Sequence, residues 1–554
     1  MSAQYKFLPV LLLFLNIHCF AQNQNKPNIV WIVCEDISPT LSMYGDTTAK
    51  TPNLDALASE SLVFEHAYAT VGVCAPSRSS IITGMSPNSI GTMHMRTGKD
   101  VFSWGKRKYK KSIPSVDIKG DAIRQYSTVI PDFVKCFPEY LRAEGYYCTN
   151  NQKTDYQFAA PITAWDENNA KAHWRNKPKN APFFSVFNFG ITHESRLWLN
   201  KDKPLTVSPQ NVPVPPYLPD NDITRTTIAR HYSNLELLDK EVQLIIDQLK
   251  EDGLYDNTII FFYSDHGGPL PRQKREILDS GLKVPFFVKD INSKIKGRTD
   301  QLISFVDLAP TILSISGIQP PDYMQGNAFL GKYTSTPRAY VYGSSDRFDE
   351  QTDRIRSVRN KRFLYLRNYF PELPKYKDIA YRKNIPMMHE MLSLKINESL
   401  SKEQLIWFGK KPTEELYDCI KDPFNLHNLA ADVNYQSQLV ELRTAFFNNL
   451  HKHTDLGLIP EAQLIEMMWP DNKQPETSNP VVRVEKNMVS IASKTKGASI
   501  AYKIADNPDE KFDYNSHWKL YTKPLTLKKG MFVYALAERI GYKESNIVIY
   551  KMKK

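Results

Sequence analysis

The chain has 554 residues, more than a single hydrophobic core accommodates, so two or more domains are expected. Its composition, 42% hydrophobic and 24% charged, is that of a globular protein and excludes a chain that is disordered as a whole. The formal net charge of +11 favours an anionic partner, although a positive charge that only aids solubility explains it equally well. Nucleic acid is not expected as that partner, because the chain has neither zinc-finger spacing nor an aromatic and basic RNA-binding motif.

The first 21 residues are expected to form a secretory signal peptide. A lysine precedes the apolar run Phe7–Ile17, and the small residue Ala21 offers a cleavage site. No later stretch reaches the roughly 18 apolar residues that a membrane-spanning helix needs. The mature chain is therefore expected to be exported, periplasmic or secreted, without a membrane span. A sulfated or carboxylated polymer is then the expected anionic partner.

Five cysteines follow the predicted signal peptide, and an odd number in an exported protein leaves at least one thiol unpaired. They are Cys34, Cys74, Cys136, Cys148 and Cys419. Cys136 and Cys148 could form a disulfide, although a chain of this length does not need one.

Three apolar runs predict buried strands, at Asn28–Val33, Phe183–Gly190 and Thr258–Ser264. Between the second and the third, apolar residues recur every three or four positions over Ile228–Lys250, which predicts an amphipathic helix. Strands that alternate with helices form a largely parallel sheet that is covered on both faces. We therefore expect an α/β protein whose ligands bind at the carboxyl ends of the strands.

Polar residues follow each predicted strand at that end. Glu35 and Asp36 follow the first strand, His193 the second, and Asp265 and His266 the third. The carboxylates and His266 would form an oxygen-rich site suited to a divalent cation such as calcium. Acids that merely face solvent are common at strand ends, but two such clusters at equivalent ends favour the metal site.

The segment Val73–Gly84, VCAPSRSSIITG, predicts a short helix that begins beside a cysteine. Pro76 suits the first turn, and Gly84 suits the end. Cys74 would lie at the helix N-terminus, where free N–H groups favour an anion, and Arg78 adds a planar cation for oxyanions. Taken alone, Cys74 is also compatible with half of a disulfide or with a buried structural thiol.

Two lysines and a histidine complete the candidate site. Lys153 follows a predicted strand at Gly145–Asn150, and Lys274 follows Asp265 closely along the chain. Together with His193 they would place cations around a tetrahedral anion and supply a proton donor for a leaving group. Each residue alone is explained as well by a solvated surface lysine or a hydrogen-bonded core histidine.

Beyond residue 337 the pattern alternates between polar and apolar residues, which predicts half-exposed antiparallel strands. A helix is expected around Tyr435–His451, and a polar linker over Asn472–Pro480 precedes further short strands. The expected domains are therefore a catalytic domain at 22–336, an antiparallel-sheet subdomain at 337–471 and a β-sandwich-like module at 481–554.

These motifs resemble those of the type I sulfatases. The segment VCAPSRSSIITG is similar to the family signature, with EDISP, YGD and TPNLDALA before it and SDHGG with a following lysine after it. The resemblance extends from about residue 27 to residue 470, where KPTEELYDCIKDPFNLHNLA resembles the family's carboxyl-terminal segment. It implies the alkaline-phosphatase-like α/β/α sandwich and a branch of exported bacterial polysaccharide sulfatases. The last module resembles the β-sandwich of some chitobiase-like enzymes, with packing favoured over carbohydrate binding as its role.

The resemblance also implies a mechanism. A formylglycine-generating maturation enzyme would oxidise Cys74 to formylglycine, whose hydrate attacks sulfur, holds the sulfate while the sugar alcohol leaves, and then expels it. Arg78, Lys153 and Lys274 would stabilise the aldehyde residue and the sulfate oxygens, and His193 would protonate the departing oxygen. Ca²⁺ would orient the nucleophile and neutralise sulfate charge. Its implied ligands are Glu35, Asp36, Cys74, Asp265 and His266.

The chain departs from the family pattern at two positions. Glu35 stands where aspartate is usual, and Asp155 stands where the family often has a histidine. We therefore expect that His94 takes over this histidine's role or that Asp155 binds a sugar hydroxyl. Arg347 and Arg354 are nominated as contacts to a uronate or a second sulfate, with ion pairing within the sheet as the alternative.

The expected substrate is a sulfated oligo- or polysaccharide, either an algal polymer such as ulvan or carrageenan or a glycosaminoglycan. Two other classes of function remain open. A phosphatase or phosphodiesterase of the same superfold would use a serine or threonine nucleophile and two metal ions. A non-catalytic protein that binds sulfated glycans would keep Cys74 as a thiol.

Overall fold

The centre of the computed structural model is an eight-stranded sheet in the order β4-β3-β5-β1-β6-β7-β2-β8. The structure describes residues 26–97, 115–292, 295–507 and 517–552, so the predicted signal peptide at 1–21 lies outside the described residues. Among the described strands of this sheet, β7 alone pairs in antiparallel fashion, with β6 and β2. The strands are β1 (Asn28–Cys34), β2 (Leu62–Tyr68), β3 (Tyr147–Asn151), β4 (Glu167–Asn169), β5 (Phe183–Phe189), β6 (Thr258–Ser264), β7 (Phe286–Lys289) and β8 (Gly297–Ser304).

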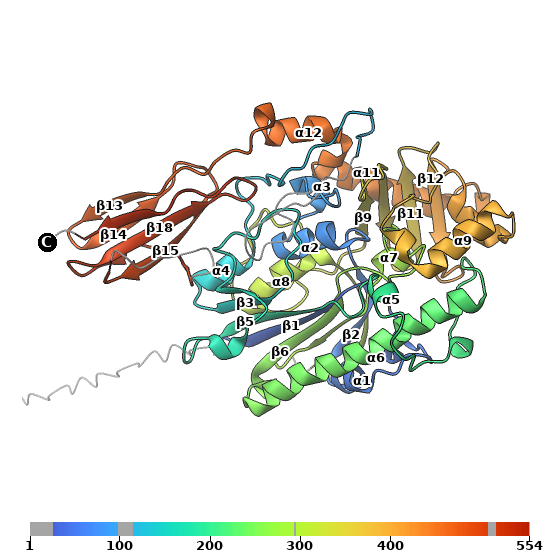
Figure 1. Ribbon diagram of the computed structural model, residues 1–554, viewed down its shortest axis with the longest axis horizontal. Coiled ribbons are helices and arrows are strands. Elements are labelled where there is room, and N and C mark those ends of the chain that lie inside the picture. The colour runs from blue at the N-terminus through green and yellow to red at the C-terminus, as the bar shows by residue number, and fades with distance from the viewer. Residues whose placement is uncertain (1–25, 98–114, 293–294, 508–516, 553–554) are drawn as a thin grey trace, which may run out of the picture.

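Helices cover both faces of the large sheet, because β1 is apolar on both sides. Trp31 and its odd-numbered neighbours pack with α2 (Cys74–Thr83), α4 (Pro138–Ala143) and α8 (Leu308–Ile315). Val30 and Ile32 pack with α1 (Pro52–Ser59) and the long α6 (Asp222–Glu251) on the other face (Figure 1). The predicted α/β/α sandwich with a mostly parallel sheet is confirmed. Further helices are α3 (Pro87–Ile90), α5 (Arg196–Leu199), α7 (Asp279–Leu282), α9 (Pro386–Ile396), α10 (Lys402–Leu405) and α12 (Glu461–Met468).

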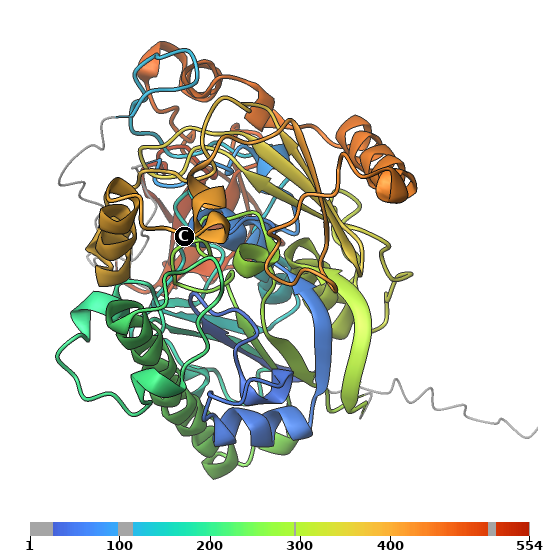
Figure 2. The same ribbon diagram turned by 90° about the vertical axis from the view of Figure 1, so that its right-hand side faces the viewer.

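A second, antiparallel sheet has the order β12-β11-β10-β9 and lies next to the β8 edge of the large sheet (Figure 2). Its strands are β9 (Val341–Ser345), β10 (Ile355–Arg359), β11 (Phe363–Asn368) and β12 (Glu414–Asp418), and α11 (Gln436–Lys452) covers one face. The segment between β11 and β12 returns to the large domain, where Met387, Met391 and Trp407 pack into the core that α6 forms. Residues from the second half of the chain therefore reach the edge of the large sheet.

The last module consists of two small sheets, β13-β14-β17 and β16-β15-β18-β19, that share one apolar core. Their strands are β13 (Val481–Glu485), β14 (Met488–Ala492), β15 (Ser499–Ala505), β16 (Lys519–Leu520), β17 (Leu525–Thr526), β18 (Phe532–Glu538) and β19 (Val548–Lys551). Lys135 Nζ donates to the Gly497 carbonyl over 2.7 Å, and Arg142 Nη2 donates to the Trp518 carbonyl over 2.7 Å. The module thus packs directly against the α4 side of the large domain.

Within the described residues, no helix is long and apolar enough to cross a bilayer. The five cysteines that follow the predicted signal peptide are all free thiols. Cys136 and Cys148 lie in the same apolar core without a disulfide between them, so the pairing considered from the sequence is not formed.

Candidate active site

The candidate site forms where three neighbouring parallel strands end. Cys34 at the end of β1 pairs with Phe189 of β5 on one side and with Ser264 of β6 on the other. This register brings Glu35 and Asp36, the turn after β5, and Asp265 to the same edge of the sheet. The polar residues that follow the three strands therefore lie together, as expected from the sequence, because the strands end at the same edge.

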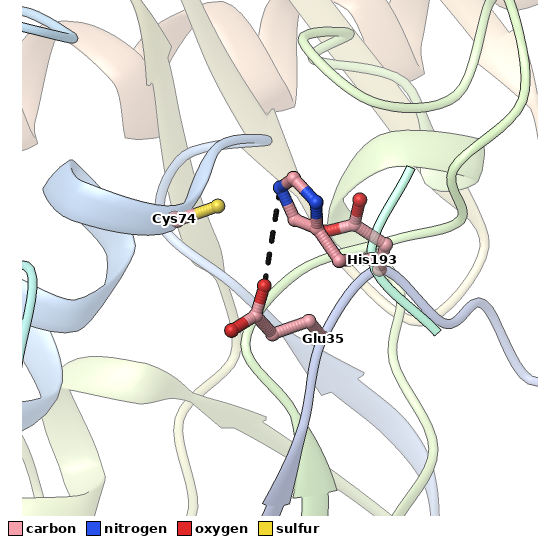
Figure 3. A group of neighbouring side chains, drawn as sticks. Glu35, Cys74 and His193 are labelled. Carbon is pink, nitrogen blue, oxygen red and sulfur yellow. Dashed lines mark ion pairs between the residues drawn. The ribbon is translucent and has the colours of Figure 1, made fainter. Parts of the chain in front are cut away.

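Cys74 is the first residue of α2, and its side chain is completely buried. Gly84, in the left-handed conformation with a φ of 69°, ends this helix as expected from the sequence. The Cys74 sulfur lies 3.4 Å from His266 Nε2 and points towards Glu35 and His193 (Figure 3). Burial raises the pKa of the thiol, but Lys274, Lys153 and His266 outweigh that effect and lower the pKa to about 6.

Two overlapping groups around Cys74 offer metal ligands: one adds Glu35, Asp36 and His193, and the other adds Asp265 and His266. Within each group the ligand atoms lie within 4.8 Å of one another. The carboxylates of Glu35 and Asp36 in one group and of Asp265 in the other offer hard oxygen donors of the kind that calcium prefers. The residues present therefore fit a hard divalent cation.

Cations neutralise these buried acids. Lys274 Nζ lies 2.6 Å and 2.9 Å from the two Asp36 oxygens, and His266 Nε2 lies 3.1 Å from Asp36 Oδ1. Burial raises the pKa of Asp36, but Lys274, His193 and His266 hold it well below its usual range. Burial lowers the pKa of His266, yet Asp265 and Asp36 raise it to about 10. The cluster thus holds negatively charged carboxylates and positively charged side chains together in a buried region.

Arg78 and Lys153 form a second cationic wall. Arg78 Nε donates to Asp265 over 2.9 Å, and its Nη1 donates to the Asn188 side chain over 2.7 Å. Lys153 Nζ lies 2.7 Å from Glu35 Oε1. Burial raises the pKa of Glu35, but Lys153, His193 and Arg78 lower it to about 2. Arg78 Nη2 is buried and has no hydrogen-bond partner among the described residues, so it is available to an oxyanion.

His193 is placed to donate a proton. Its Nδ1 lies 2.9 Å from Ser195 Oγ and 3.2 Å from the Ser195 backbone nitrogen, which leaves Nε2 as the ring nitrogen that faces the site. Nε2 lies 3.9 Å from Glu35 Oε2, on the side that faces Cys74 (Figure 3). The ring is partly accessible, with 16% of its side chain exposed.

The residues nominated for substrate binding are not all brought to this cluster. Asp155 is buried at its edge, 3.0 Å from Arg96 Nη1 and 3.7 Å from Lys153 Nζ. His94 lies elsewhere, 3.7 Å from Glu461 Oε2, which does not support it as a replacement for the family's second histidine. Arg354 lines the same small hollow as His94 and stacks over the Phe370 ring at 5.4 Å.

The structure does not place Arg347 in the Cys74 cluster. Its side chain is 2% exposed and pairs with both oxygens of Glu461 in α12, at 2.5 Å and 2.7 Å. Its Nη1 donates to the carbonyls of Met95 and Asp349. The arginine therefore ties α12 to the catalytic domain. Ion pairing was the alternative considered, but its partner comes from a helix and not from the same sheet.

Sequence reasoning missed four polar residues of the site: Asn188, Glu194, Arg275 and Arg96. Asn188 orients Arg78, and Glu194 accepts from Arg275 over 2.9 Å at each oxygen while lying 3.3 Å from Lys274. Asn188 interrupts the apolar run of β5, Glu194 follows His193, and Arg275 follows Lys274, so each carried a signal by position. Arg96 carried none of this kind, because it does not follow a predicted strand.

Comparison with known proteins identifies the family of the chain. The family model described as Sulfatase matches residues 27–318, and that of the N-sulphoglucosamine sulphohydrolase C-terminal region matches residues 272–403. An ulvan-active sulfatase from Formosa agariphila is 41% identical over 98% of each chain.

Solved structures share the fold. A protein in complex with its substrate D-glucosamine-2-N,6-O-disulfate has a TM-score of 0.52 at 16% identity, over 79% of this chain and 99% of that one. A phosphonate monoester hydrolase from Silicibacter pomeroyi has a TM-score of 0.54 at 14% identity, over 78% of this chain and 97% of that one. The fold alone therefore does not separate sulfate-ester from phosphonate-ester chemistry.

The match to the family model and the 41% identity over nearly the whole chain do separate these chemistries, and they confirm the resemblance that the signature around Cys74 indicated. The chain belongs to the sulfatase family, and it is a sulfuric ester hydrolase with a buried cluster of acidic residues and a cysteine at its centre.

Proposed function

We propose that the protein is an exported sulfatase that removes sulfate esters from an anionic polysaccharide, with ulvan as the first candidate. The observation that carries the proposal is the environment of Cys74, a fully buried residue at a helix start among two lysines, Arg78 and His193. The activity of the Formosa agariphila relative supports the choice of ulvan, and the net charge of +11 suits an anionic polymer.

We propose that Cys74 is oxidised to formylglycine by a maturation enzyme, because a thiol cannot form the hydrate that provides two hydroxyl groups on one carbon. The first hydroxyl displaces the sugar oxygen at sulfur, and the second allows the sulfate to be expelled. Because Cys74 lies at the start of α2, the backbone N–H groups of that helix and its dipole point towards the negative charge that develops during the reaction.

The remaining roles follow from position. Arg78, Lys153 and Lys274 bind and orient the sulfate oxygens, with Arg78 held by Asp265 and Asn188 and Lys274 held by Asp36. His193 donates its Nε2 proton to the departing sugar oxygen. Glu35, Asp36, Asp265 and His266, with the residue derived from Cys74, would hold Ca²⁺. When bound, this ion supplies positive charge against sulfate oxygens and lowers the pKa of a coordinated hydroxyl.

The test begins with the peptide that contains Cys74, from protein produced together with a maturation enzyme. Its mass is expected to be that of formylglycine, and sulfate release from ulvan oligosaccharides is expected to require this conversion. Cys74→Ala, made under the same conditions, serves as the matched control. Converted protein that releases sulfate from no ester, or that prefers 4-nitrophenyl phosphate to 4-nitrophenyl sulfate, would contradict the proposal.

Export is proposed from the signal-like start of the chain. Protein secreted by a bacterial host is expected to begin at Gln22, as measured by the intact mass. An intact mass that retains Met1 in an exported fraction would contradict the predicted cleavage site.

A further inference from the structure

A cavity of about 730 Å³ opens beside Lys274 and Glu194. Its walls include three parts of the chain that are far apart in sequence: the loop that carries Arg96, the turn at Lys274 and Arg275, and the segment that carries Ala380, Tyr381 and Asn384. This volume is large enough for a sugar ring, and Lys274, one of the proposed sulfate-binding residues, lines it. Among the described residues that line the cavity, Tyr381 is the only aromatic one.

Tyr381 presents its ring to this space. It is 42% exposed, although it lies in a wall of the cavity. Its ring centroid is 6.4 Å from that of His193 and 5.2 Å from that of Trp198, which meets it edge-on. A sugar whose ester oxygen is hydrogen-bonded to His193 therefore lies within contact distance of the Tyr381 ring.

The backbone that carries Tyr381 is held in place by a buried arginine and by two hydrogen bonds at the surface. Arg382, 1% exposed, donates to the Lys274 carbonyl over 3.3 Å and stacks over the Trp407 ring at 5.0 Å. The Ala380 N–H donates to Glu350 over 2.6 Å, and the Asn384 side chain donates to the Tyr381 carbonyl over 2.9 Å. A ring on such a fixed turn loses little conformational freedom when a ligand binds, so its contact contributes more to affinity.

We propose that Tyr381 is a specificity-determining residue that stacks on the pyranose ring bearing the sulfate ester. The inference rests on the proposed function and adds which part of the substrate the chain recognises besides sulfate. The aromatic face packs against the C–H groups of the sugar, as aromatic anchors do in other binding pockets. The anion-binding cations then act on the sulfate, and Tyr381 acts on the carbohydrate.

The test compares variants of Tyr381 on ulvan oligosaccharides and on inorganic sulfate, which has no ring. Tyr381→Ala is expected to raise KM for the oligosaccharides by about tenfold or more, the equivalent of about 1.4 kcal/mol, with kcat nearly unchanged. Tyr381→Leu is expected to do the same and covers the case in which the alanine variant folds poorly. Tyr381→Phe keeps the ring and is expected to stay close to the wild type.

The inhibition constant for sulfate ion is expected to be equal in all four proteins, and Phe447→Ala, which removes an equally exposed aromatic ring of α11, is expected to change neither constant. A wild-type KM in Tyr381→Ala and Tyr381→Leu would overturn the inference, as would a fall in kcat at constant KM. The proposed function fails differently, through a converted wild-type enzyme that releases sulfate from no ester.

Discussion

Two buried clusters of charged residues, one around Arg347 and Glu461 and one around Cys74, contain the same residue types but differ in how fully their hydrogen bonds are satisfied. Around Arg347 and Glu461, the arginine meets both carboxylate oxygens and two backbone carbonyls. Around Cys74, Arg78 keeps one buried nitrogen without a hydrogen-bond partner among the described residues. The partners of Arg347 are all supplied by the chain, and they tie α12 to the catalytic domain. Arg78 instead keeps a buried Nη2 group, 3.9 Å from Glu35, that can donate to an anion which the chain does not supply.

The difference also appears at the histidines. Burial lowers the pKa of His94 to about 4 although Glu461 is close, since Arg347 and Arg356 oppose a further charge. At the other cluster, Asp265 and Asp36 overcome burial and raise the pKa of His266 to about 10. The balance of neighbouring charges, and not burial alone, decides which buried histidine is protonated at neutral pH.

The sharpest test of this comparison is Cys74→Ala. Sulfate-ester hydrolysis is expected to fall by about 10⁴-fold or more, because the nucleophile is lost. Thermal unfolding is expected to stay near that of the wild type, since the substitution removes one sulfur atom from a cluster of charges. Residual activity within tenfold of the wild type would show that Cys74 is not the reacting residue.

Lys153→Met is expected to lower kcat/KM by about 10²- to 10³-fold, the loss typical when one group that stabilises transition-state charge is removed. The measurement is steady-state hydrolysis of a sulfate ester by fully converted enzyme. Lys361→Met is the matched control, because Lys361 pairs with Asp300 at the surface and is 52% exposed. Equal rates in both variants would contradict the role given to Lys153.

Arg347→Met is expected to lower stability and to leave activity unchanged, the opposite of what is expected for Cys74→Ala. Leaving Glu461 buried without its partner is expected to cost about 3–5 kcal/mol of unfolding free energy, while kcat/KM of the folded enzyme stays close to the wild type. Replacing both partners, as Arg347→Met with Glu461→Leu, is expected to recover much of that stability. A loss of kcat/KM without a loss of stability would return Arg347 to the substrate site.

Acid is expected to act on the Arg347 cluster through His94. The pKa of His94 is about 4 in the folded state and about 6.5 in an unfolded chain, so the unfolded state binds more protons between these values. Stability from this group is therefore complete above pH ~6.5 and is lost as the pH falls towards 4, by up to ~1.4 kcal/mol per pH unit.

The variant His94→Gln tests this smallest effect. Unfolding in urea at several pH values is expected to show a shallower loss of stability between pH ~6.5 and 4 than in the wild type, by about one proton's worth of slope. His451→Gln, which changes an exposed histidine of α11, is the control. Identical slopes for wild type and His94→Gln would mean that His94 is protonated while folded.

The sequence by itself determined the elements and most of the chemistry. The apolar runs and the helical period of α6 follow from burial on fixed faces, which repeats along the chain and is visible without neighbours. Polar residues at the ends of β1, β5 and β6 had to meet because parallel strands end at one edge. That is why Glu35, Asp36, His193 and Asp265 lie close together, whereas Cys74, Arg78, Lys153 and Lys274 were nominated from their residue types and from the family motifs.

Tertiary structure decided what depends on the meeting of distant segments. Arg347 reads as an exposed sheet arginine until α12 brings Glu461 to it, from 114 positions further along the chain. Tyr381 has no periodicity or motif, and it reaches the cavity because the segment after β11 folds back over the large domain. A residue's partners across such distances depend on packing between domains, and no local pattern of residues records that packing.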